Sequence, residues 1–286
     1  MIKKLLALYG LKWNPFGVEL PLEALFVPPK VELFCSRVEH GLIRDGGFAL
    51  ITGDPGSGKS VTLRLLAERL ARLSDLTVAV LTHPQSHLAD FYRELGELFG
   101  LAVQPHNRWA GFKTLRERWL AHMHHTRLRP VLLIDEAQEM LPAVLSELRL
   151  LASTQFDSRP LLSIVLAGDG RLADLLRRDD LLPLGSRIRI RLALDYASRE
   201  ELRACLDHLL ATAGNPTLMT AELMHTVCEH AVGNHRVLTT MAAELLDAAA
   251  ARELPQLDEK LYLELFTPPR APNKPRRLAP TESHRS

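Results

Sequence analysis

Apolar residues follow two alternating patterns along the chain up to about residue 195. Short apolar runs, typical of buried strands, occur at positions 48–52, 78–81, 131–134, 162–166 and 187–192. The last run alternates arginine with apolar residues, which is the pattern of a strand with one buried face. Between the runs, apolar residues recur at helical spacing over 60–73, 88–99, 112–125 and 142–152.

Strands that alternate with helices predict a parallel sheet with helices on both faces. After residue 195 the pattern changes to helices only, at 198–213, 220–232 and 236–253. Ser198 and Glu201 have the spacing of a capping box at the start of the first of these helices. We therefore predict an α/β fold: a P-loop-type domain with a five-stranded parallel sheet over 46–195, followed by a small all-helical lid domain over 196–266.

The two ends of the chain differ from this middle part. Residues 1–45 are predicted to form an N-terminal arm, rich in proline and aromatic residues between 10 and 29 and with helical spacing over 31–43. Residues 267–286 contain five prolines, and five Lys and Arg against one Glu. Their apolar content is too low for independent folding, so we expect a disordered, basic, proline-rich tail.

Composition narrows the class of protein. The chain of 286 residues is 47% apolar and 24% charged, which excludes a largely disordered or fibrous protein, and its net charge of +1 identifies no partner. Its three cysteines form no C-x-x-C pair, which argues against a disulfide framework. Lys12 and Trp13 interrupt the apolar start, so a signal peptide is not expected, and every apolar run is shorter than the ~18 residues of a membrane helix. We expect a cytoplasmic protein with no membrane contact.

A phosphate-binding motif lies between the first predicted strand and the helix after it. The motif G-x-x-x-x-G-K-S is filled by Gly53, Asp54, Pro55, Gly56, Ser57, Gly58, Lys59 and Ser60, with Val61 next. In this context the backbone N–H groups wrap a β-phosphate at the positive end of the helix. Lys59 then reaches the β- and γ-phosphate oxygens, and Ser60 is a ligand of Mg²⁺. The motif predicts ATP and Mg²⁺ as cofactors.

A second motif supports the first. The apolar strand 131–134 ends in the adjacent carboxylates Asp135 and Glu136. Asp135 is predicted to hold Mg²⁺ with Ser60, and Glu136 to orient and deprotonate the attacking water. Alone, two acids after a strand are equally consistent with a solvated turn, but the pair of motifs predicts an ATPase.

The chain resembles the AAA+ ATPases grouped with ExeA, TniB and TnsC from about residue 8 to residue 266. The residues that carry the resemblance are Tyr9-Gly10-Leu11, Asn14-Pro15-Phe16, the motif from Gly53 to Ser60, Asp135-Glu136-Ala137-Gln138, Leu166-Ala167-Gly168, Arg187-Ile188 and Gly233-Asn234-His235-Arg236. The nucleotide motifs are specific to P-loop proteins in general. The remaining motifs support the resemblance only because they occur in the same order as in the family.

The resemblance implies roles for two arginines. Arg187 corresponds to an arginine finger that acts on a neighbouring subunit, and Arg236 to a lid residue that senses the γ-phosphate. A solvated strand residue and a helix-cap arginine are the alternative interpretations. Asp169 lies where the family usually has an uncharged polar residue, so the resemblance assigns it no role. A finger acting in trans implies self-assembly, as a hexameric ring or a helical filament.

The stretch from residue 106 to 129 is basic and aromatic. Glu117 is its single acid, against Arg108, Lys113, Arg116, Arg118, Arg127 and Arg129, with Trp109 and Trp119. Such a cluster is either a solvated helix face or a surface for the DNA backbone. The transposition relatives contact DNA from this part of the domain, which favours Arg108 and Lys113 as contacts to double-stranded DNA of any sequence. His122, His124 and His125 have no acid or cysteine at ligand spacing, so metal binding is not expected there.

Three functions fit these features. The favoured one is a regulator that assembles on DNA and recruits or activates a transposase. The second is an ExeA-like ATPase of a secretion complex, whose relatives continue into a membrane span and an envelope domain that we do not expect here. The third is a nucleotide-gated adaptor with little turnover, which has no need for Glu136.

Overall fold

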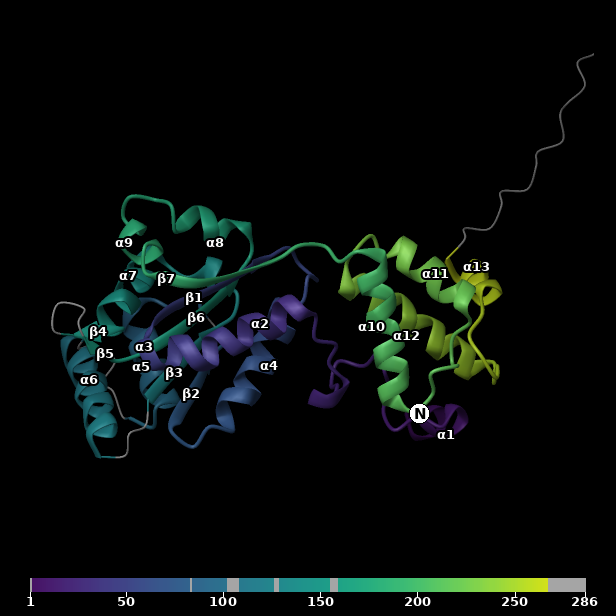
Figure 1. The fold of residues 1–286 in the computed structure, drawn as a ribbon, viewed down its shortest axis with the longest axis horizontal. Helices are drawn as coiled ribbons and strands as arrows, with labels where there is room; N and C mark the ends of the chain where they lie inside the picture. Colours follow the sequence, from purple (N-terminus) through teal and green to yellow (C-terminus); the bar gives the residue numbers. More distant parts are fainter. Residues whose placement is uncertain (1, 83, 102–107, 126–128, 155–158, 267–286) are drawn as a thin grey trace, which may run out of the picture.

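The computed structural model describes residues 2–82, 84–101, 108–125, 129–154 and 159–266. It contains a sheet covered by helices and, beyond it, a separate bundle of helices (Figure 1). The predicted tail at 267–286 lies outside the described residues.

The sheet has five parallel strands in the order β2-β3-β6-β1-β7. Their bounds are β1 Gly47–Gly53, β2 Leu76–Leu81, β3 Arg129–Ile134, β6 Ser163–Gly168 and β7 Ile188–Leu194. All five predicted strands and their parallel arrangement are confirmed. A two-stranded antiparallel ladder, β4 (Ser153–Thr154) with β5 (Arg159–Pro160), was not predicted because each strand is only two residues long.

Side chains of the central strands point alternately to two hydrophobic cores. Phe48 and Leu50 of β1 face one core, and Ala49 and Ile51 face the other. The first core is covered by α5 (Leu88–Leu98), α6 (Arg108–His125), α7 (Pro142–Leu151), α8 (Gly170–Leu175) and α9 (Leu182–Gly185). The second is covered by α2 (Pro29–Arg37), the π-helix η2 (Val38–Leu42), α3 (Ile43–Asp45) and α4 (Lys59–Ala71). The central strands β1, β3 and β6 are therefore buried on both faces, as their continuous apolar runs predicted. The edge strand β7 instead alternates buried and exposed residues, as its alternating arginines predicted.

The all-helical lid is also confirmed, and it contains one helix more than predicted. Its helices are α10 (Arg199–Ala213), α11 (Ala221–His230), α12 (His235–Ala251) and α13 (Glu259–Phe266). The capping box of α10 is present: Glu201 N donates to Ser198 Oγ at 3.2 Å, and Ser198 N donates to Glu201 Oε2 at 2.9 Å.

The N-terminal residues do not form one arm. The first helix, α1 (Ile2–Tyr9), lies beside the lid in Figure 1, and Leu5, Tyr9, Leu11 and Phe16 are buried in the lid core. Asn215 Nδ2 donates to Tyr9 O at 2.9 Å and fixes the end of this helix. After the short helix η1 (Leu22–Ala24), α2 packs on the sheet instead. The lid core therefore combines residues of the N-terminal segment with those of the helices after β7.

Candidate nucleotide site

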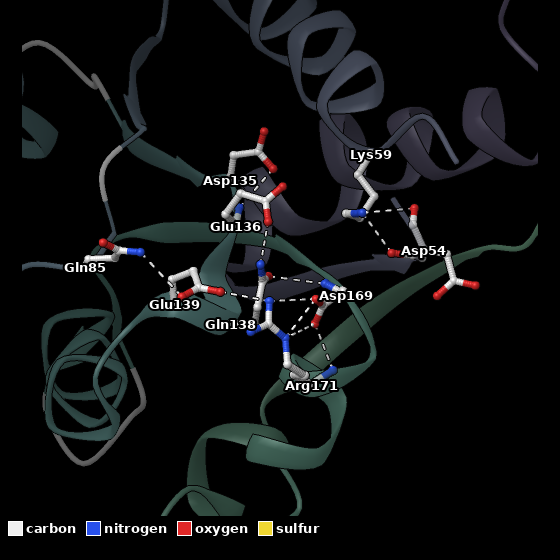
Figure 2. Close-up of polar contacts among 10 residues, drawn as sticks. Asp54, Lys59, Gln85, Asp135, Glu136, Gln138, Glu139, Asp169 and Arg171 are labelled. Carbon is white, nitrogen blue, oxygen red and sulfur yellow. Dashed lines mark hydrogen bonds and ion pairs between the residues drawn. The ribbon is translucent and has the colours of Figure 1, made fainter. Parts of the chain in front are cut away.

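Parallel strands end at the same edge of a sheet, and here that edge collects the predicted motifs. Residues 53–60 connect β1 to α4, Asp135 and Glu136 follow β3, and Asp169 follows β6. Figure 2 shows Lys59, Asp135, Glu136 and Asp169 together at this edge. Segments more than one hundred residues apart in sequence therefore form one site.

The loop from Gly53 to Lys59 has the backbone that phosphate binding requires. Gly56 and Gly58 have φ values of +83° and +102°, a region that residues with a Cβ atom rarely adopt. Lys59 is 7% exposed, and its Nζ donates to Gly53 O at 2.8 Å and to Asp54 O at 3.2 Å. The ammonium group is therefore positioned over the loop, on the loop's own carbonyl oxygens. Ser60 and Val61 lie exposed in the first turn of α4.

The loop also contains a buried hydroxyl suited to a bound anion. Ser57 Oγ is buried and has no hydrogen-bond partner among the described residues. A Cβ atom on Gly53 would lie 2.5 Å from Ser57 Oγ and 2.5 Å from Leu194 O, so this position accepts only glycine. An unpaired buried hydroxyl costs free energy unless a ligand or water satisfies it. The residues of the loop thus fit the phosphate chain of a nucleotide.

The two acids after β3 have different backbone conformations. Glu136 has a φ of +50°, in the left-handed region that is uncommon for a residue with a side chain. Its backbone N–H donates to Asp135 Oδ1 at 2.9 Å. Such conformations cost about 1–3 kcal/mol and are concentrated at functional sites, where the surrounding structure imposes them. The bend turns the chain sharply after the strand, so both carboxylates stay at the sheet edge (Figure 2).

Asp169, to which the resemblance assigned no role, is the N-cap of α8. Its Oδ1 accepts from Arg171 N at 2.9 Å, and its carboxylate pairs with the Arg171 guanidinium at 2.9 Å. These bonds from Arg171 lower the pKa of Asp169. Arg171 pairs at 2.8 Å with Glu139 as well, so its single positive charge is shared by two acids. The negative charge of Asp169 is therefore partly compensated within the chain.

Gln138 is a site residue that the sequence singled out only as part of a motif. Its Nε2 donates to Glu136 Oε2 at 2.5 Å, and its Oε1 accepts from Asp169 N at 3.2 Å. The side chain is 7% exposed. It joins the segment after β3 to the segment after β6.

The lid contacts the phosphate-binding loop directly. Asn234 Nδ2 donates to Pro55 O at 3.0 Å, and His235 N donates to Gly56 O at 3.1 Å. Arg236, the proposed sensor, is the next residue in the exposed first turn of α12. The structure therefore brings the lid motif that contains Arg236 to the phosphate-binding loop.

A mainly apolar cavity lies between the loop, the N-terminal segment and the lid. Its lining includes Phe26, Val27, Val61, Leu194, Ala197 and His235. Burial lowers the pKa of His235 below its ordinary value of 6.5. The cavity has the apolar walls and few polar groups that suit a flat aromatic ligand.

Arg187 does not lie at this site. It immediately precedes β7, so it lies at the opposite edge of the sheet from the strand ends that carry the loop and the acids. Seven strand residues at about 3.3 Å each separate the two edges by roughly 20 Å. An arginine at that distance is unsuited to its own chain's site.

The predicted DNA contacts lie on α6. Arg108 forms an ion pair at 2.5 Å with Glu147, which is 3% exposed and also accepts from Tyr92 Oη at 2.5 Å. Lys113 lies 3.7 Å from Glu117. The sequence counted Glu117 as the only opposing acid of the stretch, but Glu147 from α7 opposes Arg108 as well.

Two other members of that stretch have structural positions. Trp119 is 1% exposed and belongs to the core, so its inclusion in a surface cluster is wrong. Arg129 donates to Ile43 O at 2.8 Å, and Arg127 lies outside the described residues. Trp109 is 70% exposed and stacks on Phe112, so one aromatic residue of the cluster does reach the surface.

The described residues contain no candidate metal site and no candidate membrane-spanning helix. None of the groups of His, Cys, Asp and Glu there, including the histidines of α6, has three members arranged to hold a metal ion. Among the helices in the same part of the chain, none is both long and apolar enough to cross a membrane.

Comparisons with known proteins agree with this geometry. Residues 43–176 match the model of a family described as AAA domain. The chain is 30% identical over 249 residues to the General secretion pathway protein A of Aeromonas hydrophila. That alignment covers 85% of this chain and 44% of the relative, so the chain spans less than half of the relative's length.

Solved structures with the same fold are more distant in sequence. Cdc6p from Pyrobaculum aerophilum has a TM-score of 0.70 at 15% identity, covering 85% of this chain and 67% of that one. ORC from Drosophila, bound to DNA, gives 0.64 at 17%, covering 91% and 64%. The RuvB Holliday junction branch migration motor of Thermotoga maritima gives 0.55 at 16%, covering 83% and 68%. At these identities the likeness shows the fold alone, and the chain has the P-loop AAA fold.

Proposed function

We propose that this protein binds ATP with Mg²⁺ and hydrolyses it. The observation that carries the proposal is the meeting of Lys59, Asp135 and Glu136 at one sheet edge, with Glu136 in a left-handed conformation. Backbone N–H groups of residues 53–61 would surround the phosphates, and Ser60 and Asp135 would hold Mg²⁺, which neutralises charge on the phosphates when bound. Glu136 would orient the attacking water and accept its proton.

The adenine ring would occupy the apolar cavity between Val61 and the lid. The phosphate-binding loop forms one wall of that cavity. An adenine bound in the cavity would therefore place the phosphates of the same nucleotide at Lys59. The lid supplies His235 to the cavity and Arg236 beside it, and Arg236 would contact the γ-phosphate. Nucleotide binding would thereby bridge the sheet domain and the lid.

Two substitutions test the chemistry. Lys59→Ala is expected to abolish ATP binding, because it removes the cation that faces the phosphates. Glu136→Gln is expected to keep binding and to lose turnover by roughly 10²- to 10⁴-fold, the usual effect of removing a general base. Binding is measured by calorimetry and turnover by phosphate release. A Glu136→Gln protein with the wild-type rate would refute the assignment.

Arg187 supports head-to-tail self-assembly. Because it lies at the edge of the sheet remote from its own site, it would complete the site of a neighbouring subunit, in a ring or a helical filament. Mixing inactive Arg187→Ala with inactive Lys59→Ala is expected to restore activity, since some interfaces then pair an intact arginine with an intact loop. Strict monomers with ATP present, or mixtures without activity, would contradict this assembly.

For the cellular role we propose a secretion-type assembly ATPase. The 30% identity to the General secretion pathway protein A favours this role over transposition. The buried free cysteines are compatible with a cytoplasmic location. Copurification with proteins of a secretion complex, lost in Lys59→Ala and retained in Glu136→Gln, is the expected result.

Transposition on DNA is the second candidate, because α6 presents Lys113 and Trp109 on the surface and the Drosophila ORC that shares the fold was solved on DNA. In this case duplex DNA would bind without sequence preference, in an ATP-dependent manner, and the binding would weaken steeply with salt. Anisotropy with duplex DNA at several salt concentrations, with and without a slowly hydrolysed ATP analogue, tests it. Absence of binding at low salt with the analogue would refute DNA binding and with it the transposase partner.

A further inference from the structure

The amide of Gln138 joins two of the segments that form the nucleotide site. It donates from Nε2 to Glu136 Oε2 at 2.5 Å and accepts at Oε1 from Asp169 N at 3.2 Å, as Figure 2 shows. The side chain is 7% exposed, so little water competes for these bonds. A carboxylate at the site is therefore linked to the backbone of a different strand end.

The two bonds fix the orientation of the amide. The backbone N–H of Asp169 is a donor only, so the Gln138 atom that faces it must be the oxygen. The NH₂ group of the same amide then faces the Glu136 carboxylate, which accepts when ionised. Gln138 thus engages one carboxylate oxygen, Oε2, through a donor of defined position.

Gly168 provides the space for this arrangement. A Cβ atom on Gly168 would lie 2.5 Å from Gln138 Oε1, closer than such atoms approach, so an alanine there would displace the amide. The backbone of Gly168 is not in the left-handed region, so its conformation does not call for glycine. The requirement comes from the approach of the amide, and from Leu172, whose Cδ2 would lie at 2.8 Å.

The segment that holds the amide is itself fixed. The Asp169 carboxylate caps α8 through Arg171 N, and the Arg171 guanidinium bridges Asp169 and Glu139 at 2.9 and 2.8 Å. Glu139 belongs to the same short helix, η3 (Ala137–Glu139), as Gln138. The Asp169 end of the hydrogen-bonded path and the short helix that carries Gln138 are therefore both anchored.

We propose that Gln138 is a positioning residue that fixes the Glu136 carboxylate through one oxygen and leaves the other directed to the attacking water, and that Gly168 admits the Gln138 amide. The inference rests on the proposed hydrolysis of ATP by this chain. An active-site group displaced by about 1 Å can cost on the order of 10²-fold in rate. Loss of the Gln138 donor therefore affects turnover rather than ATP binding.

Gln138→Glu tests the donor alone. The new carboxylate keeps the length of the side chain and still accepts from Asp169 N, but it has no N–H for Glu136. We expect kcat to fall by roughly tenfold to a hundredfold, with the Kd for ATP unchanged within about twofold. Gly168→Ala is expected to give the same change in kcat. The matched control is Gln85→Glu: Gln85 donates to Glu139 at 3.4 Å in the same cluster but does not contact Glu136, so kcat is expected to stay at the wild-type value.

Exchanging the side chains of Gln138 and Glu136 tests their hydrogen bond through thermal stability, independently of catalysis. Gln138→Glu alone places two carboxylates against each other and is expected to lower Tm. Combining it with Glu136→Gln restores one donor and one acceptor in reverse order, so Tm is expected to return towards that of Glu136→Gln alone.

The possible outcomes distinguish failure of the positioning role of Gln138 from failure of the proposed ATP hydrolysis. An active wild-type protein whose Gln138→Glu variant keeps its kcat would overturn the positioning role and leave the proposed hydrolysis intact. A swap that fails to recover Tm would overturn the hydrogen bond itself. A wild-type protein without ATPase activity would overturn the proposed hydrolysis together with the role of Gln138.

Discussion

Asn234 connects the lid to the phosphate-binding loop, and its substitution separates stability from nucleotide binding. Its Oδ1 accepts from Arg236 N at 2.9 Å and from Val237 N at 3.2 Å, which makes it the N-cap of α12. Its Nδ2 donates to Pro55 O at 3.0 Å. One side chain therefore caps a lid helix and binds the loop.

The cost of Asn234→Ala follows from these bonds. Loss of an N-cap asparagine costs about 0.5–2 kcal/mol, and loss of a partly exposed hydrogen bond about 0.5–1 kcal/mol. We expect the free energy of unfolding to fall by about 2 kcal/mol, a shift of roughly thirtyfold in the unfolding equilibrium. Urea denaturation followed by circular dichroism measures it.

Asn234→Asp separates the two roles. The carboxylate still accepts both N–H groups at the positive end of the helix, so the free energy of unfolding is expected to change by less than about 1 kcal/mol. It cannot donate to Pro55 O, and it places an anion beside the loop that would hold the phosphates. Two unit charges about 4 Å apart in water repel by about 1 kcal/mol, and ATP carries several, so the Kd for ATP is expected to rise on the order of tenfold.

Asn215→Asp is the matched control. Asn215 also donates from Nδ2 to a backbone oxygen, Tyr9 O, and accepts at Oδ1 from Thr217 N at 3.2 Å, but it lies on the lid away from the loop. Its substitution is expected to leave the Kd for ATP unchanged in calorimetry. Equal effects of Asn215→Asp and Asn234→Asp on the Kd, or an unchanged stability of Asn234→Ala, would refute the reasoning.

Three further outcomes are expected. Burial lowers the pKa of His235 below 6.5, so His235 binds a proton more tightly in the unfolded chain than in the folded one. The contribution of neutral His235 to the free energy of unfolding is therefore complete above about pH 6.5 and is lost as the pH falls through the folded-state pKa. His235→Gln should reduce this dependence of the free energy of unfolding on pH, measured by urea titrations at several pH values. Burial raises the thiol pKa to about 11 for Cys35 and Cys228 and to about 12 for Cys205, so a thiol reagent at pH 8 should react with the native protein only slowly and with three thiols after denaturation. Glu147→Ala should lower the free energy of unfolding by about 2–3 kcal/mol, because Tyr92 Oη loses its buried acceptor, whereas Glu117→Ala, at an exposed pair, should change it by less than about 1 kcal/mol.

Local patterns in the sequence predicted the parts of this protein that depend on neighbouring residues. The strands around Leu50 and Leu132 are continuous apolar runs, and burial on both faces of a parallel sheet requires such runs. Lys59 and Asp135 were predicted because each lies in a short motif beside a strand. Short helices such as α8 and α9, with six and four residues, have too few turns to show a period and were not predicted.

Contacts between distant segments were not predictable from these patterns. Gln138 and Asp169 are 31 residues apart, and Arg108 and Glu147 are 39 residues apart. The apolar spacing of α1 indicates a buried face but not which core receives it, and it packs in the lid rather than in an arm. Partner choice in each case depends on the assembled fold, where side chains from several elements meet.

The entry of N-terminal residues into the lid core constrains how the lid can move. Two segments connect the lid core to the sheet core that contains Ile51. Residues 16–31 run from Phe16 in the lid core to Val31 in the sheet core, and residues 194–197 run from Leu194 in the sheet core to Ala197 in the lid core. A body attached at one point can rotate about three axes, whereas two separate attachments leave the line joining them as the least hindered axis. Opening and closing over the nucleotide cavity should therefore follow one angular coordinate. Cleavage of either connection alone should leave the lid attached while freeing the other rotations.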